Sequence, residues 1–272
     1  LCAIFLLWFP SGIGMMYWEF PSVSADDRLE RAGALTPQTI VLSPAQAYAN
    51  LNLTDPPASA RLNTFDGRPV YRFRTDDVDS LVYADTGMEQ VHVSREMMDR
   101  IASRWTRQPT AAADVRMLDE VDQWTVQANF RRLAPLWKYS WPNGEQVYVS
   151  EMTGEVVQYT TNASRLGAYL GPIPHWLYFT PLRKHGAQWN QTVIWLSGAG
   201  TIAALLGIVI GVWMYSPSKR YRISGRETSI PYRGQKRWHA ILGLVFGVAT
   251  VTWAFSGLLS MEPFEWTSAT GL

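Results

Sequence analysis

Two uncharged stretches decide the fold of this chain: TVIWLSGAGTIAALLGIVIGVWMY at residues 192–215 and AILGLVFGVATVTWAFSGLLSM at residues 240–261. They are 24 and 22 residues long. An α-helix rises about 1.5 Å per residue, so each stretch is long enough to cross a hydrocarbon core about 30 Å thick. The sequence therefore predicts a helical membrane hairpin.

The loop that joins the two stretches, residues 216–239, predicts which way the hairpin faces. It carries one acid, Glu227, and a cluster of bases. Short loops rich in Lys and Arg stay on the cytoplasmic side of a membrane. We therefore expect the long polar segment before residue 192 to form an extracytoplasmic domain. The bases are Lys219, Arg220, Arg222, Arg226, Arg233, Lys236 and Arg237.

The two ends of the chain suggest a longer protein. Residues 1–18 are apolar and nearly long enough for a span, and they lack the charged start and small-residue cleavage site of a secretory signal. We interpret them as the outer part of a transmembrane helix whose beginning is missing. Residues 262–272 are interpreted as the start of a further periplasmic segment. The chain is thus expected to be a fragment, truncated at its N- and C-terminal ends.

Composition argues against several other classes of protein. The net charge is +1 and seven of the 24 bases lie in one loop, which gives no reason to expect a nucleic-acid partner. Cys2 is the single cysteine, so neither an intrachain disulfide nor a cysteine-based zinc site is expected. The sequence contains no GxSxG, HExxH or P-loop motif, and no catalytic residue is predicted.

The polar segment has the pattern of an α+β domain. Asp66-Gly67 and Asn143-Gly144 are strong hairpin-turn signals, because Asp, Asn and Gly tolerate a positive φ. Alternating strand sequence follows each turn, VYRFR after the first and QVYVS after the second. Helices are expected at residues 45–51, behind Ser43-Pro44, and at residues 94–104. This predicts two small antiparallel β-units, each faced by a helix.

The first and last apolar segments share a short motif. Trp8-x-x-Ser11-Gly12 matches Trp253-x-x-Ser256-Gly257. Repeated membrane units are common in transporters, so the match suggests a duplicated membrane unit. Chance similarity between two apolar segments is the alternative.

Three stretches resemble a known family. Residues 143–157 carry N-G-x-x-V-Y and T-G-E-V elements that look like those of PepSY domains. From Arg237 the chain reads RWHAILGLVFG, which resembles the R-W-H-x-x-x-G-L-x-x-G start of PepSY-associated transmembrane helices. HWLYF at residues 175–179 resembles the H-x-x-x-F element before another such helix. The resemblance, to PepSY-TM proteins, covers nearly the whole chain, and some of these are called iron-regulated membrane proteins.

This resemblance implies a function in the bacterial inner membrane. Some family members are ferric-siderophore reductases that carry two haems, which implies haem-mediated electron transfer across the bilayer to a periplasmic ferric-siderophore complex. The cytoplasmic donor would be a flavin or flavoprotein, for which this chain has no binding motif. The alternative is a non-enzymatic PepSY module, anchored in the lipid bilayer, that docks or regulates a peptidase or another envelope partner.

Two histidines are the leading candidates for binding haem iron. His239 opens the second uncharged stretch, and histidines inside a membrane are commonly functional. As a ligand, His239 is expected to point into the helix bundle, beside the inner end of the first span. His175 lies among aromatic residues that would pack a porphyrin. The other interpretations are a basic flank for His239 and an interfacial anchor, with no cofactor, for His175.

Further residues would support a cofactor or contact the membrane. His185 is a second candidate ligand on the outer side, and Arg183 would pair with haem propionates or with lipid phosphates. Gly207-x-x-x-Gly211 and Gly243-x-x-x-Gly247 each place small residues on one helix face, for helix packing or for a porphyrin edge. His92 lies in strand-like sequence and is expected to be a surface histidine.

The predicted fold class is an α+β extracytoplasmic PepSY-like domain plus transmembrane α-helices. An aromatic segment at the membrane interface joins the domain to the helical hairpin. The predicted boundaries are residues 1–18 (first span), 19–164 (PepSY-like domain), 165–191 (interfacial segment), 192–215 (span), 216–239 (basic loop), 240–261 (span) and 262–272 (further periplasmic segment).

Overall fold

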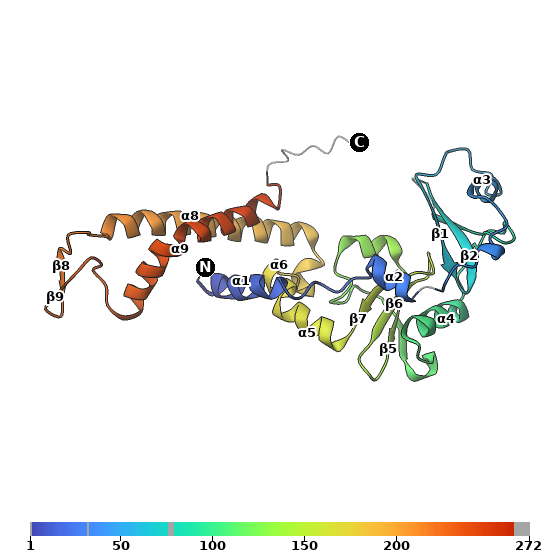
Figure 1. The fold of residues 1–272 in the computed structure, drawn as a ribbon, viewed down its shortest axis with the longest axis horizontal. Coiled ribbons are helices and arrows are strands. Elements are labelled where there is room, and N and C mark those ends of the chain that lie inside the picture. The colour runs from blue at the N-terminus through green and yellow to red at the C-terminus, as the bar shows by residue number, and fades with distance from the viewer. Residues whose placement is uncertain (1, 32, 76–78, 264–272) are drawn as a thin grey trace. The chain divides into compact units, whose positions relative to one another are not determined.

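Figure 1 shows the fold in a computed structural model, which describes residues 2–31, 33–75 and 79–263. The chain divides into two compact units. The α+β unit runs from Trp8 to Lys184. The helical unit contains the described residues up to Leu7 and those from His185 onward.

Two long apolar helices make up most of the helical unit. Helix α8 covers Gly186–Met214 and α9 covers Gly234–Leu259, and both are long and apolar enough to cross a membrane. Helix α1 (Cys2–Met15), whose first turns belong to this unit, is a shorter apolar helix. The long helices begin before their uncharged stretches, because a helix satisfies its own backbone hydrogen bonds in polar and apolar surroundings alike.

Glycines bring α8 and α9 into close contact. A Cβ on Gly247 would lie 2.7 Å from Cγ1 of Ile208, and a Cβ on Gly211 would lie 3.1 Å from Cδ2 of Leu244. The first glycine of each predicted G-x-x-x-G pair has no such neighbour within 4 Å among the described residues. Only the second glycine of each pair therefore contributes to the contact between the two helices.

The basic loop contains a small hairpin that the sequence analysis did not predict. Strands β8 (Tyr221–Ile223) and β9 (Arg226–Thr228) pair in antiparallel fashion. Ser224 and Gly225 between them have φ values of 50° and 79°, as both central residues of a type I′ hairpin turn require. The charged side chains of both strands are exposed.

Two antiparallel sheets form the α+β unit, which confirms the predicted fold class and both β-units. One has the strand order β1-β2-β3 and the other β4-β5-β6-β7. The strands are β1 (Ser59–Phe65), β2 (Arg68–Arg74), β3 (Asp79–Tyr83), β4 (Asp114–Met117), β5 (Leu136–Ser140), β6 (Gln146–Ser150) and β7 (Val156–Thr160).

Both predicted hairpin turns are present, with different backbone conformations. Asp66 and Gly67 have φ values of 47° and 85°, which fits a two-residue type I′ turn. In the second hairpin the Gly144 N–H donates to the Trp141 carbonyl, and of the loop residues Pro142–Gly144 only the glycine has a positive φ, of 90°. Pro142 explains the difference, because proline fixes a negative φ and therefore selects a type I turn.

Helix α4 (Arg95–Thr106) packs into a core that both sheets share (Figure 1). Ser94 caps its first turn by accepting a hydrogen bond from the Met97 N–H, as expected of serine at this position. The sequence predicted one helix for each sheet. The structure differs, because α4 contacts both sheets. The shared cluster includes Met98, Ala102 and Trp105 of α4, Phe65 and Val70 of the first sheet, and Tyr139 and Val147 of the second.

The opposite face of the first sheet is covered by α3 (Pro44–Ala49). Its start carries a capping box, in which Ser43 and Gln46 exchange hydrogen bonds between side chain and backbone. Ala47 is buried against Tyr71 and Phe73 of β2. The other helical turns of this region are α2 (Ala25–Arg31), Pro37–Thr39, Thr110–Ala112 and Ala128–Leu133.

The aromatic segment folds as short helices against the end of α1. These are α5 (Asn162–Leu170), α6 (Pro172–Trp176) and α7 (Thr180–Arg183). A Cβ on Gly14 would lie 2.8 Å from the Leu170 carbonyl oxygen, so the backbone of α1 touches the α5–α6 junction directly. This contact fixes α6 against the C-terminal part of α1.

Candidate functional site

His175 lies half-buried on α6, against α1. Its Nδ1 is 3.2 Å from the Trp8 carbonyl oxygen and 3.4 Å from the Ser11 hydroxyl oxygen. A carbonyl oxygen can only accept, so Nδ1 carries the hydrogen of the ring and donates it to Trp8. In this tautomer the lone pair of a neutral imidazole lies on Nε2, an atom by which histidine binds iron.

The surroundings of His175 favour this neutral ring. Burial lowers the pKa of His175, and the hydrogen bond with the Trp8 carbonyl acts in the opposite direction without offsetting the burial. Ser11 is buried and donates to the same carbonyl oxygen, at 3.1 Å. Because a metal ion binds neutral imidazole, the site holds His175 in the protonation state that a ligand requires.

Glycines of α5 and of the α5–α6 junction let these helices lie close to the end of α1. A Cβ on Gly171 would lie 3.0 Å from the backbone of Gly14 and Met15, and a Cβ on Gly167 would clash with Trp18. The absence of side chains at these positions lets α5 and α6 approach α1 at backbone distance. The hydrogen bonds of His175 are thus a consequence of close helix packing.

The partners of His175 had a signal in the sequence, although it was interpreted differently. Trp8 and Ser11 are the first two residues of the W-x-x-S-G motif, which suggested a duplication. In the second copy, Ser256 donates to the Trp253 carbonyl at 2.8 Å, as Ser11 does to Trp8. The two motifs therefore share a local hydrogen bond as well as a sequence, and the duplication stays a prediction.

Arg183 lies on α7 with its guanidinium 4.9 Å from the centre of the Tyr178 ring. The neighbouring Lys184 amine is 3.7 Å from a carboxylate oxygen of Glu120. Gln123 binds the same segment to the domain, donating to the Tyr178 carbonyl at 2.6 Å. Arg183 thus lies beside the Tyr178 ring, and its pairing with a propionate or a lipid phosphate stays a prediction.

The other candidate histidines are exposed. His239 lies near the start of α9, and its side chain is exposed in the described part of the chain. His185 precedes α8 and is also exposed. Within the described residues His239 is therefore not covered by neighbouring helices, and its predicted position beside the inner end of the first span stays a prediction. His92 is exposed, in keeping with a surface histidine.

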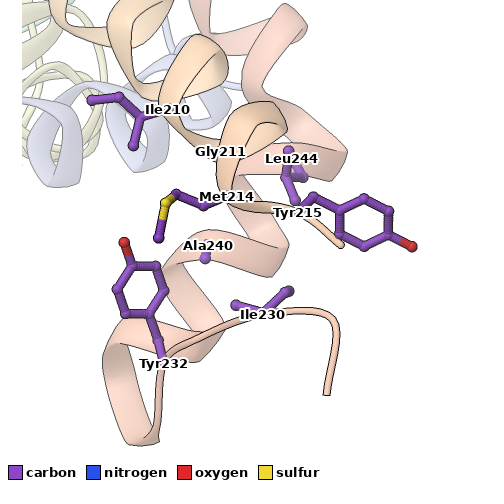
Figure 2. A pocket seen from close by; sticks show the side chains of 8 residues that line it. All are labelled: Ile210, Gly211, Met214, Tyr215, Ile230, Tyr232, Ala240 and Leu244. Atoms are coloured by element: carbon purple, nitrogen blue, oxygen red, sulfur yellow. The ribbon is translucent and has the colours of Figure 1, made fainter. Parts of the chain in front are cut away.

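A small apolar cavity lies between the end of α8, the start of α9 and the loop after β9 (Figure 2). Its volume is about 20 Å³, enough for roughly one water molecule. Figure 2 shows the Met214 and Tyr232 side chains on one side and Leu244 on the other. A cavity of this size does not hold a porphyrin. Its lining residues are Ile210, Gly211, Met214, Tyr215, Ile230, Tyr232, Ala240 and Leu244.

Another titratable cluster stabilises the second sheet. The Lys138 amine is 2.8 Å from Asp122, and the Tyr148 hydroxyl donates to the same carboxylate oxygen at 2.7 Å. Burial favours the neutral acid, but the hydrogen bonds from Lys138 and Tyr148 outweigh it, so the pKa of Asp122 is lowered. Lys138 and Tyr148 are buried and the carboxylate is neutralised, which fits a structural role.

Comparison with known proteins gives one match. The family described as PepSY-associated TM region matches residues 32–270. No curated protein and no solved structure matches the chain.

Proposed function

Because the chain belongs to the PepSY-associated TM region family, we propose that it passes electrons across a bacterial inner membrane, through haem, to a ferric complex outside the cytoplasm. The family and the two apolar helices identify a membrane protein. Three further parts belong to the proposal alone: the bound haem, the orientation of the protein in the membrane, and a ferric-siderophore substrate.

The observation that carries the proposal is the hydrogen bond from His175 Nδ1 to the Trp8 carbonyl oxygen. Histidines that bind a metal through Nε2 usually donate the other ring N–H to a carbonyl or carboxylate, which fixes both the tautomer and the rotation of the ring. Here the ring comes from α6 and the acceptor from α1, so two packed helices orient it. These residues therefore fit a haem-iron ligand, and His175 would hold the iron through Nε2.

Neighbouring side chains suit the rest of such a group. Trp176 and Phe179 are partly exposed aromatics beside His175, and flat aromatic surfaces pack well against a porphyrin. Arg183 offers a cation to a propionate. Bound haem would supply a one-electron carrier at this face of the membrane. At the other face His239 is the proposed ligand, and a flavin or flavoprotein is the proposed donor.

We propose that the basic loop is cytoplasmic and the α+β unit periplasmic. The loop carries seven bases and one acid, and this asymmetry sets the orientation of a hairpin. A side chain at Gly225 would have no neighbour within 4 Å, so a reporter can be inserted there. We expect a reporter that works only in the cytoplasm to be active at this position. Activity there of a reporter that works only in the periplasm would contradict the orientation.

The electron-transfer function is tested with the full-length protein in liposomes. We expect a Soret band that shifts on reduction, and reduction of an external ferric chelate by a reductant sealed inside the liposomes. Empty liposomes and liposomes without the internal reductant are the controls. Purified protein that has no Soret band after expression with ample haem would contradict the proposal.

A second function is favoured by the exposure of His239, because an exposed histidine beside Lys236 and Arg237 also suits a plain basic flank. In that case the helices are anchors, and the α+β unit docks a peptidase or another envelope protein. A haem-free, folded protein that binds such a partner through the α+β unit would support this function.

A further inference from the structure

Three arginines surround one glutamate where the two sheets of the α+β unit meet. Arg28 comes from α2, Arg61 from β1 and Arg72 from β2, while Glu155 precedes β7. The distances from Glu155 are 3.7 Å to Arg28, 3.6 Å to Arg61 and 3.4 Å to Arg72. Over these described side chains, three positive charges face one negative charge.

The distances show that one carboxylate does not satisfy three guanidinium groups. Charge-assisted hydrogen bonds between nitrogen and oxygen are about 2.7–2.9 Å long. Arg100 and Asp66 in the same unit form such a pair, with two contacts of 2.6 and 2.9 Å. All three contacts with Glu155 are longer, so its charge is shared and the donors are not used up.

Arg72 forms the fixed base of this cluster. It is 7% exposed, and it donates to the Thr153 carbonyl and to the Asn63 side-chain oxygen. Burial is the largest cause that lowers the pKa of Arg72; Glu155 and Asp79 act against it, and the charges of Arg61 and Arg28 act with it. The charged form of Arg72 is therefore costly here, and a further negative charge nearby would stabilise it.

Arg28 and Arg61 form the open side of the cluster. Their side chains are 38% and 54% exposed. Beyond the long contacts with Glu155, the described residues give neither guanidinium a hydrogen-bond partner. The nearby Arg74 differs, because Asp79 neutralises it at 2.9 Å. Arg28 and Arg61 thus offer unused donors to solvent, next to the buried guanidinium of Arg72.

We propose that Arg28, Arg61 and Arg72 form a binding site for a small oxyanion with two negative charges, such as phosphate or a dicarboxylate. A dianion would balance the excess of two charges, and its oxygens would accept from the forked donors of Arg28 and Arg61. The buried Arg72 would attract the ligand by its charge, while its own hydrogen bonds hold its side chain in place. The site requires neither haem nor electron transfer, so it is independent of the proposed function.

The test measures binding of inorganic phosphate, and separately of succinate, to the full-length protein in detergent by calorimetry. Sodium chloride holds the ionic strength constant, because exposed charges are screened by salt. The double variant Arg28→Gln/Arg61→Gln should weaken binding by about tenfold or more, since it removes both exposed charged donors from the ligand. Both residues are partly exposed, so the variant should fold. The stronger of the two ligands identifies the class of oxyanion.

The matched control is Arg107→Gln/Arg132→Gln, which removes the same charge from exposed positions elsewhere in the unit. Its affinity should stay within about twofold of the unmodified protein. Glu155→Gln removes the competing carboxylate, and the folded variant should bind the anion more tightly. Absence of saturable binding by both ligands, equal losses in the two double variants, or weaker binding by folded Glu155→Gln would each overturn the proposal.

Discussion

Replacing His175 with alanine should remove the Soret band of one haem and lower the rate of transmembrane reduction by more than about 100-fold. The expected effect is large because the substitution deletes the imidazole that two helices orient. Ser11→Ala should be milder, since the Trp8 carbonyl still accepts from Nδ1. We expect this variant to keep its haem with a shifted reduction potential. Difference spectra and potentiometric titration measure both effects.

His92→Ala is the matched control, because His92 is an exposed histidine of the same unit. It should leave the spectrum and the rate unchanged. His239→Ala should remove the other haem band if the proposed ligand at the second face is right. Full haem content in both His175→Ala and His239→Ala would make the anchor-and-dock function the better explanation.

Gly154→Ala should destabilise the α+β unit by about 2–5 kcal/mol. Gly154 has a φ of 61°, and a residue with a Cβ loses about 1–2 kcal/mol in this conformation. The new methyl group would also clash with Cε2 of Phe65, which is 2% exposed in the shared core. Overpacking of such a core costs about 1–3 kcal/mol. Denaturant unfolding followed by tryptophan fluorescence measures the change.

Gly67→Ala separates the two contributions. Gly67 has a φ of 85°, so the backbone cost is similar. Its new Cβ would lie 3.3 Å from the end of the flexible Arg104 side chain, which can move away. We expect a loss of about 1–2 kcal/mol. Equal losses at the two glycines would show that the clash with Phe65 adds no cost to the backbone strain.

The helices and hairpins that the sequence predicted correctly depend on neighbouring residues. Each of them is specified by residues that lie close together in the chain. Examples are the Asp66-Gly67 turn, the Ser43 and Ser94 caps, and the long uncharged stretches. The β8–β9 hairpin was not predicted, because its strands are too short to show an alternating pattern. In the second hairpin, Pro142 was the local signal that changed the turn type.

The apolar helices and the two β-units were predictable from the sequence, because they follow from local propensity and apolar periodicity, and the family resemblance was predictable from short motifs. Three features could be seen only in the folded molecule: α4 packs against both sheets, Trp8 orients His175, and three arginines share Glu155. Trp8 and His175 are 167 residues apart, and Arg72 and Glu155 meet only when the two sheets dock. Contacts of this kind depend on how complete elements pack, and the pattern along any one element does not contain them.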